Sequence, residues 1–229
     1  MCFSASASFG AGAVILVIGI ISINKTRTVA HRIFALIPLF FAIQQFTEGL
    51  LWLVLANPDY DNWRPFLTHL YLTFAWIIWP VFLPFSLGLL EKNINRKKLL
   101  HFFLLIGIFV SSGFLYVMVS NNAHALINEY HIDYKFDYKP VYPILFSGLY
   151  LIATVISLFV SSTKNMWTFG AVNLASYLFS KIFFNGHVIS IWCFFGALSS
   201  IIVLWIILDI KTSHKKKKPI LKISLANLL

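Results

Sequence analysis

The chain has 229 residues, of which 59% are hydrophobic and only 11% are charged. Soluble domains carry about a quarter charged residues, so the composition argues against a soluble globular protein and indicates an integral membrane protein. The net charge of +10 would suit a nucleic-acid-binding protein. The positions of the basic residues favour a role in membrane topology instead, and we expect no nucleic-acid partner.

Seven apolar segments follow one another along the chain, each near the roughly 20 residues that a membrane-spanning helix requires. They are residues 5–23, 33–56, 66–90, 99–120, 140–162, 166–184 and 187–209. The sequence therefore predicts an all-α integral membrane protein. Residues 1–209 would form a bundle of seven transmembrane helices in the lipid bilayer, and residues 210–229 a polybasic tail.

Most of the 18 Lys and Arg residues follow the first, third, fifth and seventh segments, whereas Asp59, Asp61 and Asp133 lie on the other side. Lys and Arg concentrate on the cytoplasmic side of membrane proteins. We therefore expect the N-terminus outside and the C-terminus in the cytoplasm. Four consecutive lysines of the tail, Lys215, Lys216, Lys217 and Lys218, are expected to bind anionic lipid, at about 1 kcal/mol for each lysine.

The second segment carries Gln44, Gln45 and Glu48 in its middle. One charged residue near the centre of such a helix costs roughly 2.5–3.5 kcal/mol, and an intramembrane carboxylate is a candidate functional group. It could relay a proton, bind a cation or amine, or act as a general acid or base. The alternative is a protonated side chain that is hydrogen-bonded within the bundle. In either case we expect Glu48 to face the interior, close to Cys2, His69 or Cys193.

Counting about 1.5 Å of helix per residue places the less common polar residues in the outer half of the bundle. The predicted ligand-binding set is Glu48, Gln44, Gln45, His69, Trp76, Trp79, Trp192 and Cys193. Stripes of Ser, Thr and Tyr at helical spacing also mark the fifth and sixth segments, and these favour helix packing.

Three residues are candidates for catalysis: Cys2, Glu48 and His69. Removal of the initiator methionine would leave Cys2 with a free amine beside its thiol, an arrangement that can assist nucleophilic attack. Glu48, His69 and Cys193 are also of types that bind zinc. None of them has the local spacing of a metal motif, so we expect no metal site, and the sequence indicates no particular cofactor.

Two further features concern backbone geometry. Residues 130–138 alternate apolar and polar side chains, which predicts a half-buried strand. It could be a lid over the outer mouth or an aromatic ribbon at the headgroup level, and we favour the ribbon. Pro80 and Pro84 interrupt the third segment and kink it, and the carbonyls they free must find other donors within the bundle.

Four stretches carry a family resemblance: MCFSASASFGAGA at the start, FFAIQQFTEGLLW, Trp79-Pro80, and ISIWCFFGALSS. Together they resemble an uncharacterised bacterial family, a domain of unknown function whose small seven-helix members begin Met-Cys-Phe-Ser. The resemblance spans roughly residues 1–209 and implies a multi-pass protein of the bacterial inner (plasma) membrane with no known activity. It also implies that one site unites Cys2, Ser4, Gln45, Glu48, Trp79 and Trp192-Cys193.

We expect a protein that binds or moves a small ligand in a polar outer pocket anchored by Glu48. The ligand could be an amine, a proton-coupled solute or a lipid. One alternative is an intramembrane enzyme that uses Cys2 or a Glu/His/Cys metal site. Another is a structural or assembly protein, which would have a dry and closely packed interior.

Overall fold

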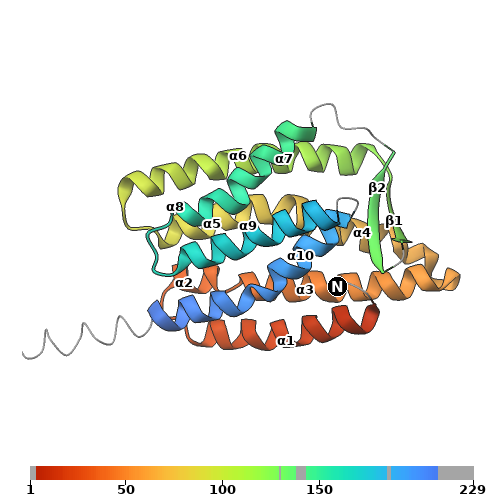
Figure 1. Ribbon diagram of the computed structural model, residues 1–229, viewed down its shortest axis with the longest axis horizontal. Coiled ribbons are helices and arrows are strands. Elements are labelled where there is room, and N and C mark those ends of the chain that lie inside the picture. The colour runs from red at the N-terminus through yellow and green to blue at the C-terminus, as the bar shows by residue number, and fades with distance from the viewer. Residues whose placement is uncertain (1–3, 129, 138–142, 185–186, 211–229) are drawn as a thin grey trace, which may run out of the picture.

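The computed structural model describes residues 4–128, 130–137, 143–184 and 187–210, and it is an elongated bundle of helices with a β-hairpin at one end (Figure 1). The end that carries this hairpin is called the hairpin end here. The predicted tail and Cys2 lie outside the described residues.

Seven helical segments run along the bundle, close to the seven that the sequence predicts. The first segment is α1 (Ala5–Asn24), and the second consists of α2 (Val29–Phe34) and α3 (Ile37–Ala56). The third consists of η1 (Pro58–Trp63), α4 (Arg64–Leu72), η2 (Thr73–Ile78) and α5 (Trp79–Leu90), and the fourth is α6 (Ile94–Ser120). The fifth consists of α7 (Pro143–Leu151), η3 (Ile152–Ile156) and α8 (Ser157–Val160), the sixth is α9 (Met166–Phe183), and the seventh is α10 (Val188–Leu198), after which helix continues to Ile210.

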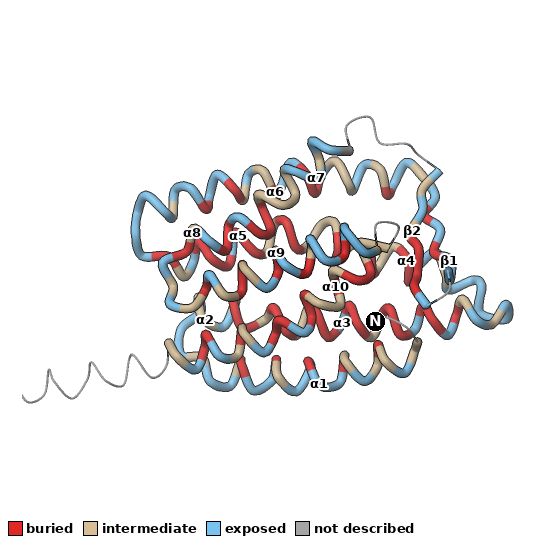
Figure 2. Tube along the Cα trace, viewed as in Figure 1, coloured by how far each residue is buried: buried red, intermediate tan, exposed pale blue. Residues whose placement is uncertain are grey.

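In the described part of the chain, five helices are long and apolar enough to cross a membrane, judged by length and composition: Ala5–Asn24, Val29–Ala56, Pro58–Leu90, Ile94–Ser120 and Val188–Ile210. The apolar helix Ile144–Val160 is shorter. Buried residues concentrate in α3, α5 and α10, whereas the outer sides of α1 and α6 are exposed (Figure 2). Those exposed sides are apolar: Val17, Leu105 and Phe109 are 56%, 63% and 60% exposed. Such a surface suits contact with lipid.

Small residues set the packing of α1 against α3. The buried stripe of α1 consists of Ser8, Gly12, Ile15, Gly19 and Ser22, spaced alternately by four and three residues. A Cβ atom at Gly19 would lie 2.5 Å from the side chain of Leu39 on α3. Small residues at this spacing let two helix backbones approach closely.

The prolines of the third segment free backbone carbonyls that neighbouring helices cover. Pro84 has no N–H to donate to the carbonyl of Pro80, four residues earlier. Gly107 of α6 packs onto this carbonyl so closely that a Cβ there would lie 1.9 Å from the Pro80 oxygen. One turn away, Ser111 Oγ donates a hydrogen bond of 3.0 Å to the carbonyl of Ile77.

Within the alternating segment, residues 131–136 form a strand with a partner, so the mostly helical chain also contains a β-hairpin that the all-α prediction did not include. Strands β1 (Ala123–Asn128) and β2 (His131–Phe136) pair antiparallel, with Ala123 opposite Phe136 and Asn128 opposite His131. The pairing satisfies the backbone groups that a lone strand would leave open. Tyr134 stacks on Tyr71 of α4 with ring centroids 4.8 Å apart, which docks the hairpin on the bundle.

Glu91 joins two loops at the end of the bundle opposite the hairpin. It is 4% exposed. Its carboxylate accepts hydrogen bonds from the backbone N–H groups of Lys92, Asn93 and Ser162 and from Ser162 Oγ. Burial raises the pKa of this carboxyl, but the hydrogen bonds from Ser162, Asn93 and Lys92 outweigh burial and lower the pKa below its ordinary value.

We expect Gly107→Ala to lower the free energy of unfolding by about 1–3 kcal/mol, because the methyl group overlaps the Pro80 carbonyl and forces α5 and α6 apart. Equilibrium unfolding in mixed micelles measures this loss. Gly148→Ala is the matched control, since nothing lies within 4 Å of a Cβ there. Equal stabilities of the two variants would contradict the close approach.

Glu91→Gln should also destabilise the protein, by about 1–3 kcal/mol at neutral pH, because the amide cannot accept all four hydrogen bonds. A carboxyl with a lowered folded-state pKa stabilises above its unfolded pKa of roughly 4, and the stability is lost as the pH falls through the folded value. The difference between wild type and variant should therefore shrink in acid. Asp59→Asn, a change of an exposed acid at the hairpin end, should show no such loss at neutral pH.

Candidate functional site

Three polar side chains of α3 lie in the core of the half of the bundle nearer the hairpin, called the hairpin half here. Gln44, Gln45 and Glu48 are all fully buried, so Glu48 faces the interior as predicted. Glu48 Oε1 accepts a hydrogen bond of 2.6 Å from Ser190 Oγ of α10, and Gln45 Nε2 lies 3.5 Å from Glu48 Oε2. Gln44 Oε1 accepts a hydrogen bond of 2.9 Å from Trp79 Nε1. These bonds connect α3 to α5 and α10.

Cys193 lies beside this polar group. It follows Ser190 by three residues, so both side chains project from the same side of α10. The thiol is free and buried, and Glu48, Gln44 and Tyr71 surround it. The expected closeness of Cys193 to Glu48 is confirmed. The sequence analysis missed Tyr71, which is fully buried and carries the stacked Tyr134 ring of the hairpin.

His69 does not join the group, contrary to expectation. Its Nδ1 lies 2.7 Å from the carbonyl oxygen of Pro65 and its Nε2 3.3 Å from that of Met118 on α6. The reason is that His69 and Tyr71 are two residues apart on α4, which corresponds to about 200° of rotation around the helix axis. Tyr71 points into the core, and His69 therefore points away from Glu48.

The described residues also offer no metal site. No three His, Cys, Asp or Glu side chains among them gather closely enough to hold an ion, so Glu48, His69 and Cys193 do not form such a set. Cys2, the candidate nucleophile, lies outside the described part of the chain.

A cavity of about 290 Å³ lies next to the polar group and is bounded by η2, α6, α7, α9 and α10. Cys193 forms part of its wall and separates it from Glu48. The lining residues are Ala75, Trp76, Phe114, Ser147, Tyr150, Leu151, Tyr177, Lys181, Val188, Ile189, Trp192 and Cys193.

The walls are largely aromatic and packed against one another. Trp76 stacks on Phe114 with centroids 4.7 Å apart, and Trp192 contacts the rings of Tyr150 and Tyr177 at 5.6 and 5.1 Å. Trp192 Nε1 also donates a hydrogen bond of 3.2 Å to the carbonyl of Asn173. The indole orientation is therefore fixed from two sides, which makes a preformed wall.

The π-helical turn of η2 ties the cavity to the prolines. The N–H of Trp79 bonds to the carbonyl of Phe74, five residues back, and Pro80 has no N–H. Neither residue can then satisfy the Ala75 carbonyl. Tyr150 of α7 supplies the missing donor, with its hydroxyl 2.5 Å from that oxygen.

A second space of about 30 Å³ shares Tyr150, Trp192 and Cys193 with the cavity. Trp79 and Asn173 also line it. It is large enough for a water molecule, which needs roughly 10–15 Å³. Polar and aromatic groups thus continue from the cavity toward the centre of the bundle.

The predicted ligand-binding set is therefore divided by the structure. Trp76, Trp192 and Cys193 line the cavity, and Trp79 lines the smaller space. The three polar residues of α3 lie behind Cys193. Several wall residues are absent from the predicted set, although the hydroxyl stripes on the fifth and sixth segments contained their signal: Ser147, Tyr150 and Tyr177. Lys181, one turn after Tyr177, was missed as well.

A comparison with family models finds one that matches residues 1–218. The chain belongs to DUF6629, a family of unknown function. This confirms the expected membership of an uncharacterised domain family. No curated protein and no solved structure matches the chain.

We expect Ser190→Ala to lower the free energy of unfolding by about 1–3 kcal/mol, because the buried carboxyl of Glu48 loses a hydrogen-bond donor. Denaturant titration of the reconstituted protein measures the change. Ser180→Ala is the matched control, because its hydroxyl is equally buried but bonds to the Ser176 carbonyl of its own helix. Losses of the same size in both variants would argue against a special role for the bond between α3 and α10.

Proposed function

We propose that the protein binds a small, largely apolar ligand in the 290 Å³ cavity of the hairpin half. The observation that carries the proposal is the cavity itself, with preformed aromatic walls and a few polar groups. Ligand sites typically combine these features, at volumes of roughly 300–1,000 Å³. A purely structural protein would be expected to have a closely packed interior here.

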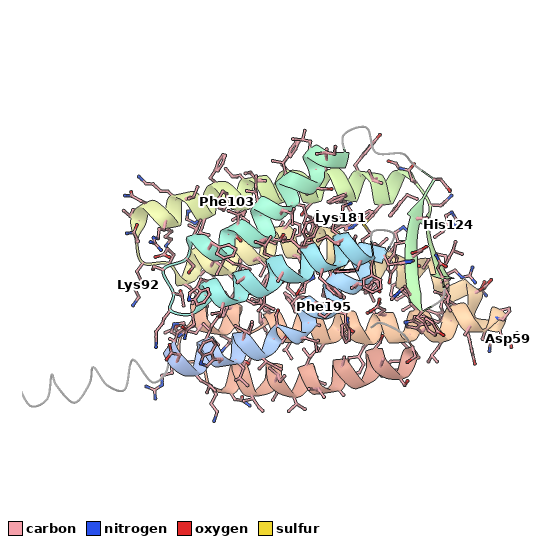
Figure 3. The ribbon with its side chains drawn as sticks, in the orientation of Figure 1. Asp59, Lys92, Phe103, His124, Lys181 and Phe195 are labelled. Atoms are coloured by element: carbon pink, nitrogen blue, oxygen red, sulfur yellow. The ribbon has the colours of Figure 1, made fainter. Side chains whose placement is uncertain are left out.

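We further propose that the chain crosses the bacterial inner membrane seven times, with its N-terminus outside. The apolar outer sides of α1 and α6 support this arrangement. Lys92 lies on the loop at one end and Asp59 at the hairpin end (Figure 3). Arg96 follows Lys92 in the first turn of α6, and Lys164 lies on the loop before α9. The cavity would then lie in the outer half, and Lys215 to Lys218 would meet anionic lipid on the cytoplasmic side.

In this proposal Glu48 positions the site and does not itself touch the ligand. It holds α10 through Ser190 and lies behind Cys193, which forms part of the cavity wall. The same α10 turn carries Trp192, so the α3 polar group fixes one wall of the cavity.

Cys193 provides a built-in reporter of access to the cavity. In a Cys2→Ser background in lipid nanodiscs, methyl methanethiosulfonate should modify Cys193, and mass spectrometry of the intact protein gives the rate. We expect Ser147→Trp to slow the modification on the order of tenfold, because the indole fills the cavity.

Gly148→Trp is the matched control, since this neighbouring residue does not line the cavity and has open space around it. It should leave the rate unchanged. Equal rates of Cys193 modification in the two variants would contradict an accessible cavity.

A further inference from the structure

The mouth of the cavity lies on the side of the bundle. Of the residues that line it, Ser147 of α7 and Lys181 of α9 are the two that are exposed. The elements α7, η3 and α8 follow one another along one helical segment. Its half farther from the hairpin, η3 with α8, packs on α9, whereas α7 packs on α6. Figure 1 shows α7 and α9 spreading apart toward the hairpin end. The opening therefore lies between these two helices.

The end of the bundle is closed above the cavity by the hairpin. Phe136 of β2 stacks on Trp76, a cavity wall, with centroids 4.8 Å apart. Asp133 of β2 accepts a hydrogen bond from His187 at the start of α10. Among the described residues, these contacts cover the hairpin end beside Trp76, and the exposed lining residues lie at the lateral mouth.

The surface beside this mouth is apolar. Large exposed side chains flank it on both helices: Ile144 and Leu145 on α7, and Leu178 and Ile182 on α9. Ile144 is 87% exposed and Ile182 is 71% exposed. A surface of this kind meets acyl chains and not water, so a ligand that enters here comes from the bilayer.

Lys181 supplies the single formal charge of the cavity lining. No carboxylate among the described residues forms an ion pair with it, and Figure 3 shows it toward the hairpin end of α9. Its long apolar stem can follow the cavity wall while the ammonium group reaches the polar boundary. This cation would repel an amine and attract an anionic head group.

We propose that the ligand is a single-chain anionic lipid that enters sideways between α7 and α9, with its head group at Lys181 and its chain among Trp76, Phe114 and Trp192. This identification of the ligand class rests on the proposed function of the same cavity.

The test uses the Cys193 modification assay in phosphatidylcholine nanodiscs, with laurate as the probe. Laurate should slow modification on the order of tenfold, and Lys181→Gln should weaken its apparent affinity roughly tenfold, the loss expected for a hydrogen bond to a charged group. Lys135→Gln is the matched control, because it removes a positive charge at the same end of the bundle but not from the cavity lining.

Three other probes define the ligand chemistry. Dodecanol, dodecyltrimethylammonium and butyrate should each protect much less than laurate, because they lack the negative charge, reverse it, or lack the chain. Equal protection by the cationic or neutral chain, or an unchanged laurate affinity in Lys181→Gln, would overturn the anionic head group. Equal protection by butyrate would overturn the lipid source.

The two proposals fail in different ways. If Ser147→Trp slows modification but laurate gives no protection, the cavity is accessible and the inference about its ligand is wrong. If Ser147→Trp has no effect on modification, the proposed binding cavity itself is wrong.

Discussion

The burial of one carboxyl group governs the arrangement of the hairpin half of this bundle. Glu48 is fully buried on a helix that the sequence marks as membrane-spanning, and a buried carboxyl is costly unless it is hydrogen-bonded. Its donor Ser190 comes from α10, far along the chain. The pair fixes how α10 faces α3, and thereby directs Cys193 toward the polar group and Trp192 toward the cavity.

A second constraint comes from the prolines of the third segment, because every backbone carbonyl inside an apolar bundle needs a donor or a close contact. Pro80 leaves the carbonyl of Ala75 to the hydroxyl of Tyr150, which ties α7 to η2 across the cavity. Gly107 covers the carbonyl that Pro84 frees. The π-helical turn of η2 is therefore held in place by neighbouring helices, and the cavity lies beside it.

Much of the fold could be predicted from the sequence, because runs of about 20 apolar residues have one stable form in a membrane. The strand pattern of β2 was also visible, whereas its partner β1, also six residues long, does not alternate strictly between apolar and polar side chains. The interior position of Glu48 followed from the free-energy cost of a charged side chain in the middle of an apolar helix. The position of His69 could not be predicted, because it depends on how α4 is rotated about its axis. That rotation is set by the packing of Tyr71 against Tyr134 of the hairpin. The cavity depends on the divergence of α7 and α9, a property of packing that no local pattern encodes.

The presence of a natural ligand in the cavity tests the proposed binding most directly. Native mass spectrometry of the wild type and of Ser147→Trp, both extracted from cells with their surrounding lipid, measures it. We predict that the wild type retains one single-chain anion that denaturation releases, and that Ser147→Trp has lost it. A wild type without any bound small molecule, or a Ser147→Trp variant that carries the same amount, would contradict the binding function proposed for this cavity.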